Sequence, residues 1–185
     1  MIFRTIIHMI RSQLASRLGI RDVGRVRLMV LPTDLDVLGH MNNGIYFSLM
    51  DLGRLDLLVR AGAWKKFSSV GFYPVMANET ISFRRSLKPW QRFVLETRVV
   101  GVDDRAVYVE QRFTVEGEIY ASAMIRARFL KKSGGTVSVA ELAELLGHDV
   151  SGLVPPTWVS EWAEHVALPS SRQAAPSQWG EGENP

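Results

Sequence analysis

Residues 34–46, DLDVLGHMNNGIY, place two carboxylates, a histidine and two asparagines directly before an apolar pattern at helical spacing. The first turn of a helix carries free backbone N–H groups and a partial positive charge. An acid beside such a terminus can attack a carbonyl carbon, or activate water against it, while the N–H groups polarise the carbonyl. The stretch is therefore a candidate active site, and it also fits a structural turn.

Three side chains of this stretch could act on a proton or a carbonyl. Asp36 is the candidate catalytic carboxylate, although aspartate also favours turn positions where it caps the backbone. Asp34 fits local turn hydrogen bonds better than catalysis. His40 could orient the acid, bind substrate or act as a second base near neutral pH, and a structural histidine fits the sequence equally well.

The residues that follow would shape the start of the helix. Asn42 and Asn43 are both common N-cap residues, and their position beside Gly44 favours a role in forming a pocket of N–H groups. Tyr46 fits core packing and could line a pocket for the substrate. Asp51 lies further along the helix among apolar residues, where a surface or interface salt bridge is the better interpretation.

A second group of charged residues, Arg84, Arg85 and Lys88, ends a predicted strand. Arginine suits the geometry of phosphate, so these side chains could hold a phosphorylated ligand; a solvated strand end is the alternative. Strand alternation would send Arg84 and Arg85 to opposite faces, so that at most one points into a given groove. With no cysteine and four scattered histidines, the sequence predicts no metal site.

Hydrophobic periodicity predicts the elements around these residues. A first strand covers residues 25–31 and ends at Pro32, and a helix with spacing i, i+3, i+4 runs to about Arg60, where Ala61 and Gly62 stop it. Alternation of period two then predicts four antiparallel strands joined by short turns, at residues 75–83, 93–100, 107–115 and 119–129. The small Ala121 and Ala123 would let a helix approach closely. One helix against a curved antiparallel sheet is an α+β arrangement.

Composition divides the 185 residues into three parts: an N-terminal helical extension (1–23), a central domain (24–133) and a C-terminal extension (134–185). The last part contains a short helix at residues 139–146, a helical turn around Trp158 and Trp162, and a mobile tail from Pro169. Residues 1–133 carry 21 Lys+Arg against 12 Asp+Glu, a net +9, whereas residues 134–185 carry 1 against 7. The basic part could attract a phosphorylated ligand. No nucleic-acid-binding motif is present.

The N-terminal segment is an amphipathic pattern without acidic residues through position 21. It could dock on the protein or on a partner subunit, or it could contact an anionic membrane surface peripherally. Three arginines interrupt its apolar residues, which argues against a cleavable signal. No apolar run is long enough for a membrane span, and the lack of cysteine fits a cytoplasmic protein.

Three segments of the chain resemble a known family: LPTDLDVLGHMNNGIYFSLMDLGR, ISFRRSLKPWQRF and VGVDDRAVYVEQRF. Over residues 24–132 the chain resembles the hotdog-fold thioesterases, within them the 4-hydroxybenzoyl-CoA thioesterase-like branch, and most of all the thioesterase superfamily member six group. The resemblance implies a hotdog fold, a curved antiparallel sheet wrapped around one long central helix. It also implies an acyl-CoA thioesterase acting on a fatty or aromatic acyl-CoA.

The resemblance further implies roles for individual residues. Asp36 takes the position of the catalytic carboxylate, and the backbone N–H near Asn43 that of the oxyanion donor. Coenzyme A, as part of the substrate and with no further cofactor, would meet Arg84, Arg85 and Lys88. Active sites would form across the interface of a homodimer or homotetramer.

Two other functions stay open. Asp36 and His40 could serve as the acid/base pair of a hotdog enoyl-CoA hydratase or dehydratase, which the loop resembles less closely. A non-catalytic acyl-CoA-binding protein is the second alternative. Whether Asp36 attacks directly or activates water also stays open, because His40, Asn42 and Asn43 depart from the best-studied branch.

Overall fold

A computed structural model describes residues 2–170 and 172–177 of the chain. The helices are α1 (Ile2–Leu14), a 3-10 turn (Pro32–Asp34), α2 (Asn43–Arg60), α3 (Ala63–Ser69), α4 (Val139–Leu146) and α5 (Thr157–His165). The strands are β1 (Gly24–Met29), β2 (Phe72–Phe83), β3 (Arg92–Val102), β4 (Val107–Val115), β5 (Glu118–Lys131) and β6 (Thr136–Val137).

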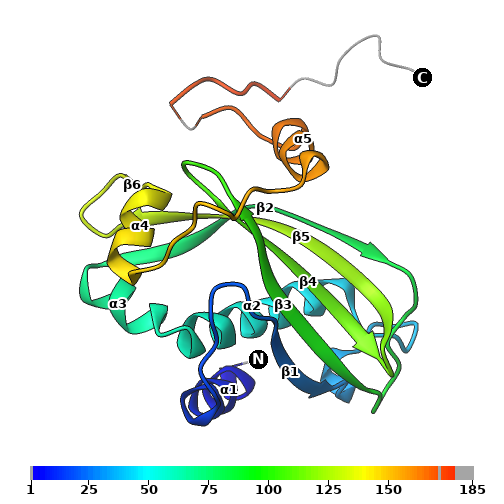
Figure 1. Cartoon of the computed structure of the whole chain (residues 1–185). Coiled ribbons are helices and arrows are strands. Elements are labelled where there is room, and N and C mark those ends of the chain that lie inside the picture. Colours follow the sequence, from blue (N-terminus) through cyan, green and yellow to red (C-terminus); the bar gives the residue numbers. More distant parts are fainter. Residues whose placement is uncertain (1, 171, 178–185) are drawn as a thin grey trace.

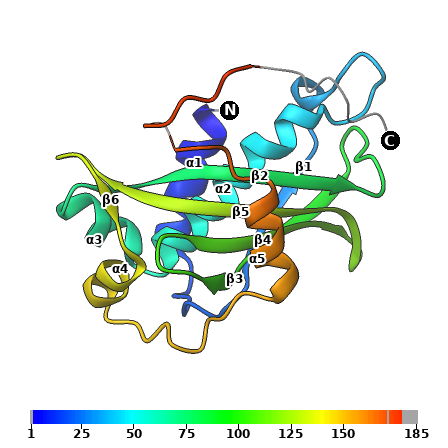
Figure 2. The same cartoon turned by 90° about the horizontal axis from the view of Figure 1, so that it is seen from above.

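The strands form one antiparallel sheet in the order β1-β3-β4-β5-β2, with the short β6 paired to the end of β5. The sheet curves around α2, and α5 covers its outer face (Figures 1 and 2). This is the α+β hotdog fold that the resemblance predicts. Alternation along the strands does not reveal which strands are neighbours, and β2 pairs with β5 rather than with β3, which follows it in the chain.

The central helix α2 has the limits that the sequence predicts. Asn42 is its N-cap, and the side-chain Oδ1 of Asn42 accepts a hydrogen bond from the backbone N–H of Gly44 at 2.8 Å. Beyond Ala61 the chain turns at Gly62, whose φ of 72° lies in the left-handed region that favours glycine. The inner face of α2 buries Tyr46, Leu49, Met50, Leu52 and Leu57 against the sheet.

The helix lies very close to the sheet at Gly53, a contact that the sequence did not predict. A Cβ atom on Gly53 would lie 2.6 Å from Thr97 Oγ1, 2.7 Å from Gln111 Nε2 and 2.9 Å from Leu95 Cδ2. Ala121 and Ala123, the small residues that the sequence offered for such an approach, are buried in the same core. Hydrogen in place of a methyl group therefore sets the spacing between α2 and strands β3 and β4.

The C-terminal elements extend the core. The helix expected at residues 139–146 is α4, which begins with a capping box between Ser138 and Glu141 and ends at Gly147. It packs with α3, a helix that the sequence did not predict, around Phe67 and Phe129. The helical turn expected near Trp162 is α5, which seals Tyr108 and Met124. The tail predicted from Pro169 lies in part outside the described residues, at 171 and 178–185.

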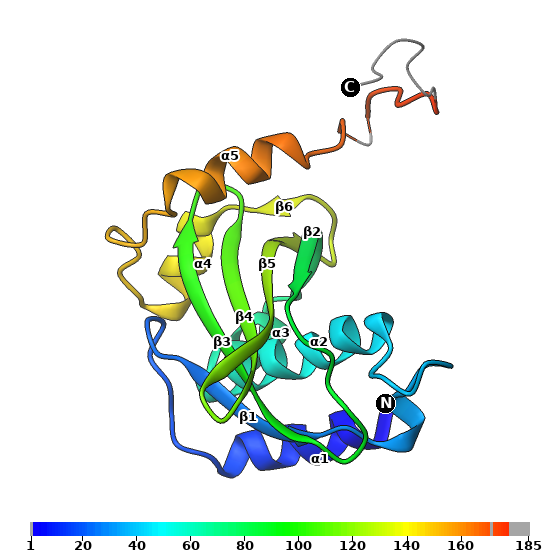
Figure 3. The ribbon, with the colours of Figure 1, turned by 90° about the vertical axis from the view of Figure 1, so that its right-hand side faces the viewer.

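The N-terminal helix α1 lies along α2, as Figure 3 shows. Polar contacts hold it there: the Ser12 hydroxyl donates to Asp56 Oδ1 at 2.6 Å, and Arg4 forms an ion pair with Asp34 at 2.8 Å. Arg60 of α2 donates to the carbonyl of Ser16 at 2.8 Å. The predicted helix is therefore confirmed, and it docks on the protein through its polar side.

Replacing Gly53 by alanine should destabilise the fold by about 1–3 kcal/mol, because the new methyl group overpacks the helix–sheet contact. Chemical denaturation measures the change. Gly24→Ala is the control, since a Cβ atom there meets its neighbours at an ordinary 3.6 Å. Equal stability of the two variants would contradict the proposed spacing.

Asn42→Ala should lower the free energy of unfolding by about 1 kcal/mol, because the N-cap hydrogen bond to Gly44 is lost. Asn43→Ala is the matched control next to it, and we expect a change within about 0.5 kcal/mol, because the Asn43 side chain is exposed and caps nothing. Thermal unfolding of both variants tests the difference. A larger loss of stability in Asn43→Ala would show that Asn42 is not the capping residue.

Candidate functional site

The loop between the 3-10 turn and α2 is closed by backbone hydrogen bonds. Leu35 and Met41 form an isolated antiparallel bridge, and the N–H of Asp36 donates to the carbonyl of His40 at 2.8 Å. Gly39 reverses the chain at a φ of 75°, which explains a glycine between the two carboxylates and the histidine. The sequence DLDVLGH thus folds as a small hairpin with Asp36 and His40 facing each other at its neck.

Asp36 caps this hairpin with one of its two carboxylate oxygens. Oδ1 accepts hydrogen bonds from the backbone N–H groups of Leu38, at 2.9 Å, and His40, at 3.2 Å. Within the described residues, Oδ2 has no hydrogen-bond partner, and the side chain is half-buried. The turn-capping alternative is therefore real, and it leaves one oxygen of the carboxylate open for a ligand.

The neighbouring acid, Asp34, has a structural environment. Its carboxylate is buried, where it accepts hydrogen bonds from Arg4 and from the backbone N–H of Leu31 at 2.8 Å. Its backbone carbonyl accepts from the N–H of Asn42 at 2.8 Å. The local turn bonds expected for Asp34 are present, and the ion pair with Arg4 adds a link to α1 that the sequence did not predict.

The start of α2 offers one open backbone donor. The N–H of Gly44 is occupied by the Asn42 cap, whereas the N–H of Asn43 has no acceptor among the described residues. A Cβ atom on Gly44 would lie 3.2 Å from Asn42 Oδ1, so glycine makes room for the cap. Asn42, Asn43 and Gly44 are all exposed in the single chain. The positive end of the α2 dipole therefore faces solvent beside the hairpin.

The two remaining residues of the stretch differ in their surroundings. Tyr46 is buried in the core, with its ring edge-on to Phe83 and Phe113 and its hydroxyl accepting from the N–H of Leu87 at 3.3 Å. Burial raises the pKa of the Tyr46 hydroxyl. The His40 imidazole is half-buried and makes no hydrogen bond within the described part of the chain. Core packing of Tyr46 is observed, and a contact of Tyr46 with substrate stays a prediction.

The basic residues after β2 lie beside the hairpin, because the N–H of Met41 donates to the carbonyl of Leu87 at 3.0 Å. The expectation that Arg84 and Arg85 face opposite sides is wrong. Strand β2 ends at Phe83, so alternation stops, and both guanidinium groups reach Glu118, at 3.1 and 2.9 Å. The hydrogen bond from Arg84 and the two nearby charges lower the pKa of Glu118.

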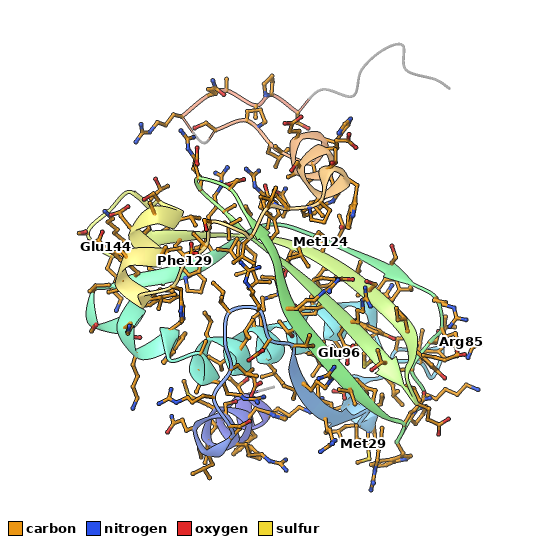
Figure 4. All side chains as sticks on the ribbon, in the orientation of Figure 1. Met29, Arg85, Glu96, Met124, Phe129 and Glu144 are labelled. Atoms are coloured by element: carbon orange, nitrogen blue, oxygen red, sulfur yellow. The ribbon has the colours of Figure 1, made fainter. Side chains whose placement is uncertain are left out.

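All three basic side chains of this segment are exposed, and Figure 4 shows Arg85 projecting from the edge of the molecule. Arg85 also lies over the ring of Tyr120, 5.8 Å from its centre. The backbone N–H of Lys88 donates to Gln91 Oε1 at 3.0 Å, and the residue is exposed. The segment thus presents three cations next to the α2 N-terminus, and two of them pair with Glu118 of β5.

The sequence did not predict a polar network that lies halfway along α2. Arg54 is buried, forms an ion pair with Asp51 and donates to Gln111 Oε1 at 2.9 Å. Arg54 also approaches Glu79 of β2 at 2.7 Å, as an ion pair rather than an aligned hydrogen bond. Burial raises the pKa of Glu79, and the Arg54 charge partly offsets this. The surface salt bridge expected for Asp51 is confirmed. The other contacts of Arg54 join α2 to β2 and β4, which are distant in the sequence, so local patterns could not predict them.

An apolar cavity of about 380 Å³ opens beside this network, between α2 and the sheet. Asp51 and Arg54 stand at its polar side, while Leu55, Trp64 and Met76 are among its apolar lining. The described residues contain no group of three or more histidine, aspartate or glutamate side chains that could hold a metal ion.

Relatives at the level of sequence include the protein THEM6 of Xenopus laevis, which is 43% identical over 100 residues, or 54% of this chain and 48% of the frog protein. The chain spans about half the length of the curated relatives that it matches first.

Solved structures share the fold at low sequence identity. YbaW of Escherichia coli superimposes with a TM-score of 0.63 at 22% identity and covers 68% of this chain and 98% of its own. A DHNA-CoA thioesterase of Staphylococcus aureus gives a TM-score of 0.60 at 13% identity, and the match covers 68% of this chain and 89% of that protein. The protein SAV2348 of the same organism, solved in complex with CoA, gives 0.61 at 13%, covering 83% and 100%.

A family model supplies the remaining comparison. The model described as the thioesterase-like superfamily matches residues 30–167, from the end of β1 through α5, and so includes the hairpin, α2 and the whole sheet after β1. This match covers well over half of the chain. The chain belongs to the thioesterase-like superfamily.

Proposed function

We propose that this protein is a thioester hydrolase that acts on acyl-CoA. One observation carries the proposal: the hairpin places a carboxylate with one open oxygen, on Asp36, next to a helix N-terminus whose Asn43 N–H is also open. The hairpin and the helix are joined by the hydrogen bond from Asn42 N–H to the Asp34 carbonyl. Membership of the thioesterase-like superfamily supports the same reaction.

In the proposed mechanism the thioester carbonyl lies over the start of α2. The N–H of Asn43 donates to the carbonyl oxygen and stabilises the negative charge that develops on it. The open oxygen of Asp36 either attacks the carbonyl carbon, giving an anhydride that water then cleaves, or takes a proton from the attacking water. In both routes the carbon–sulfur bond breaks and coenzyme A leaves as a thiol. His40, at the neck of the hairpin, assists the proton transfer.

The basic segment is the proposed contact for the phosphates of coenzyme A. Arg84, Arg85 and Lys88 are exposed, and Arg84 and Arg85 converge on one carboxylate that a phosphate group could replace. The hydrogen bond between Met41 and Leu87 keeps this segment next to the reactive hairpin. A CoA complex is known for one protein of the same fold, SAV2348.

The acyl group is proposed to be apolar and the assembly even-numbered. The cavity beside α2 has an apolar lining and begins near Asp51, about 12 Å along the helix from Asn43 at 1.5 Å per residue. In the single chain the tip of the hairpin, residues 37–39, and residues 42–44 at the start of α2 are exposed to solvent. A second copy of the chain, in a homodimer or homotetramer, would supply the missing wall.

Asp36→Asn should lower acyl-CoA hydrolysis by at least about a hundredfold, because a carboxamide can neither attack nor take a proton. Asparagine can still accept the hydrogen bonds of Leu38 and His40, so the melting temperature should stay close to that of the unchanged protein. Release of free thiol from a panel of saturated acyl-CoA substrates measures the activity.

Comparison with Asp36→Ala separates the two roles of this side chain. The alanine variant should lose both the activity and some stability, whereas the asparagine variant should lose the activity alone. Normal turnover of Asp36→Asn would refute the assignment. Conversion of an enoyl-CoA without thiol release would instead indicate a hydratase.

Replacing Arg84 and Arg85 together by glutamine should raise KM for acyl-CoA about tenfold, because charge-assisted hydrogen bonds to phosphate are lost. KM for the same acyl group on N-acetylcysteamine, a thiol without phosphates, should not change. Arg98→Gln is the control, since Arg98 is an exposed arginine that pairs with Glu110 on the sheet. Equal effects on both thioesters would exclude phosphate binding by this segment.

A further inference from the structure

Helix α1 turns its apolar side away from the protein. Five large apolar side chains at spacing i, i+3 and i+4 share one face of the helix, and each exposes between 51% and 84% of its surface: Phe3, Ile6, Ile7, Ile10 and Leu14. We call these five residues the outer stripe. An amphipathic helix on a globular protein normally faces its core with such a stripe. Here the arrangement is reversed.

The opposite face of α1 explains the reversal. Arg4, His8 and Ser12 recur every four residues and lie on the side that meets the protein. The buried Ser12 hydroxyl donates to Asp56 Oδ1 at 2.6 Å, and Arg4 pairs with the buried Asp34. Burial together with the nearby charges of Arg11 and Arg4 lowers the pKa of His8. These contacts hold the helix with the outer stripe toward solvent.

Positive charge lies beside the outer stripe. Residues 1–21 include four arginines and no acidic residue. Arg11 and Arg17 are exposed, and Arg27 and Arg92 line an open groove between α1 and the sheet together with Arg11. Glu116 is the acidic residue at that groove. The surface on this side of the molecule thus combines an apolar ridge with flanking guanidinium groups, which suits a surface of anionic phospholipids.

We propose that α1 binds the protein to an anionic membrane surface. The helix lies in the plane of the interface, with the outer stripe among the upper parts of the acyl chains and the arginines at the phosphate level. Within the described residues, no helix is both long enough and apolar enough to cross a membrane. A symmetric contact between two copies is disfavoured, because it would bring the arginines that flank one stripe against those of the other. Figures 1 and 3 place α5 on the other side of the molecule from α1.

Co-sedimentation of the full chain with lipid vesicles tests the proposal. We expect binding to vesicles of phosphatidylcholine mixed with phosphatidylserine, weaker binding to phosphatidylcholine alone, and loss of the difference at high salt. Ile6→Gln and Ile10→Gln should each lower the affinity about tenfold, because each removes one apolar side chain from the interface. Glutamine keeps the helix propensity. Arg11→Gln should weaken binding about fivefold, and only for the phosphatidylserine vesicles.

Two controls keep the outcomes distinct. Trp158→Gln removes an exposed apolar side chain from a different helix, α5, and should bind vesicles like the unchanged protein. Asp36→Asn should also bind normally, so the membrane proposal and the proposed hydrolysis fail separately. Binding that survives both isoleucine changes would overturn the proposal. Absence of vesicle binding would also overturn it. In that case, if light scattering shows a dimer that dissociates in the isoleucine variants, the outer stripe contacts a second copy of the chain.

Discussion

The buried carboxylate of Asp34 holds three parts of the chain together. A charge removed from water needs compensating donors, and Asp34 receives them from Arg4 of α1 and from the backbone N–H of Leu31. The carbonyl of the same residue accepts the N–H of Asn42, where α2 begins. One aspartate therefore links the N-terminal helix, the 3-10 turn and the start of the central helix, and so ties the hairpin that carries Asp36 to that start.

In Asp36 a structural role and the proposed catalytic role would share one side chain. Two backbone N–H groups hold one oxygen, which fixes the rotamer of the carboxylate before any substrate arrives. Ordering a reactive group in advance removes an entropic cost from the reaction step. The capping interpretation and the catalytic interpretation of this aspartate are therefore compatible, although the sequence presents them as alternatives.

Long periodic segments explain what the sequence could predict. The stripe of α2 and the alternation of β3, β4 and β5 are sustained over many residues, and Asn42 and Gly62 are typical start and stop residues, so the limits of α2 agree with the prediction. The position of the candidate loop before the helix followed directly, since it depends on local order alone.

What the sequence could not show depends on contacts between distant segments. The pairing of β2 with β5 leaves no trace in alternation, and Arg84 and Arg85 converge because the strand ends one residue before them. The ion pair of Arg54 with Glu79 joins α2 to β2, and Gln111 ties the same arginine to β4. Short α3 lacks enough turns for a clear period. The apolar stripe of α1 was visible, but only the polar contacts of Arg4 and Ser12 show which way it faces.

The junction between α1 and α2 has a thermodynamic consequence. Ser12 bonds α1 to α2, Arg4 pairs α1 with the 3-10 turn, and Arg60 of α2 bonds Ser16 just after α1, so polar contacts hold this junction. Heat capacity rises when apolar surface meets water and falls when polar surface does, so these polar contacts add no positive heat-capacity change when α1 detaches. The free energy of releasing α1 would then curve little with temperature. The free energy of unfolding the apolar core around α2 follows the usual dome-shaped curve.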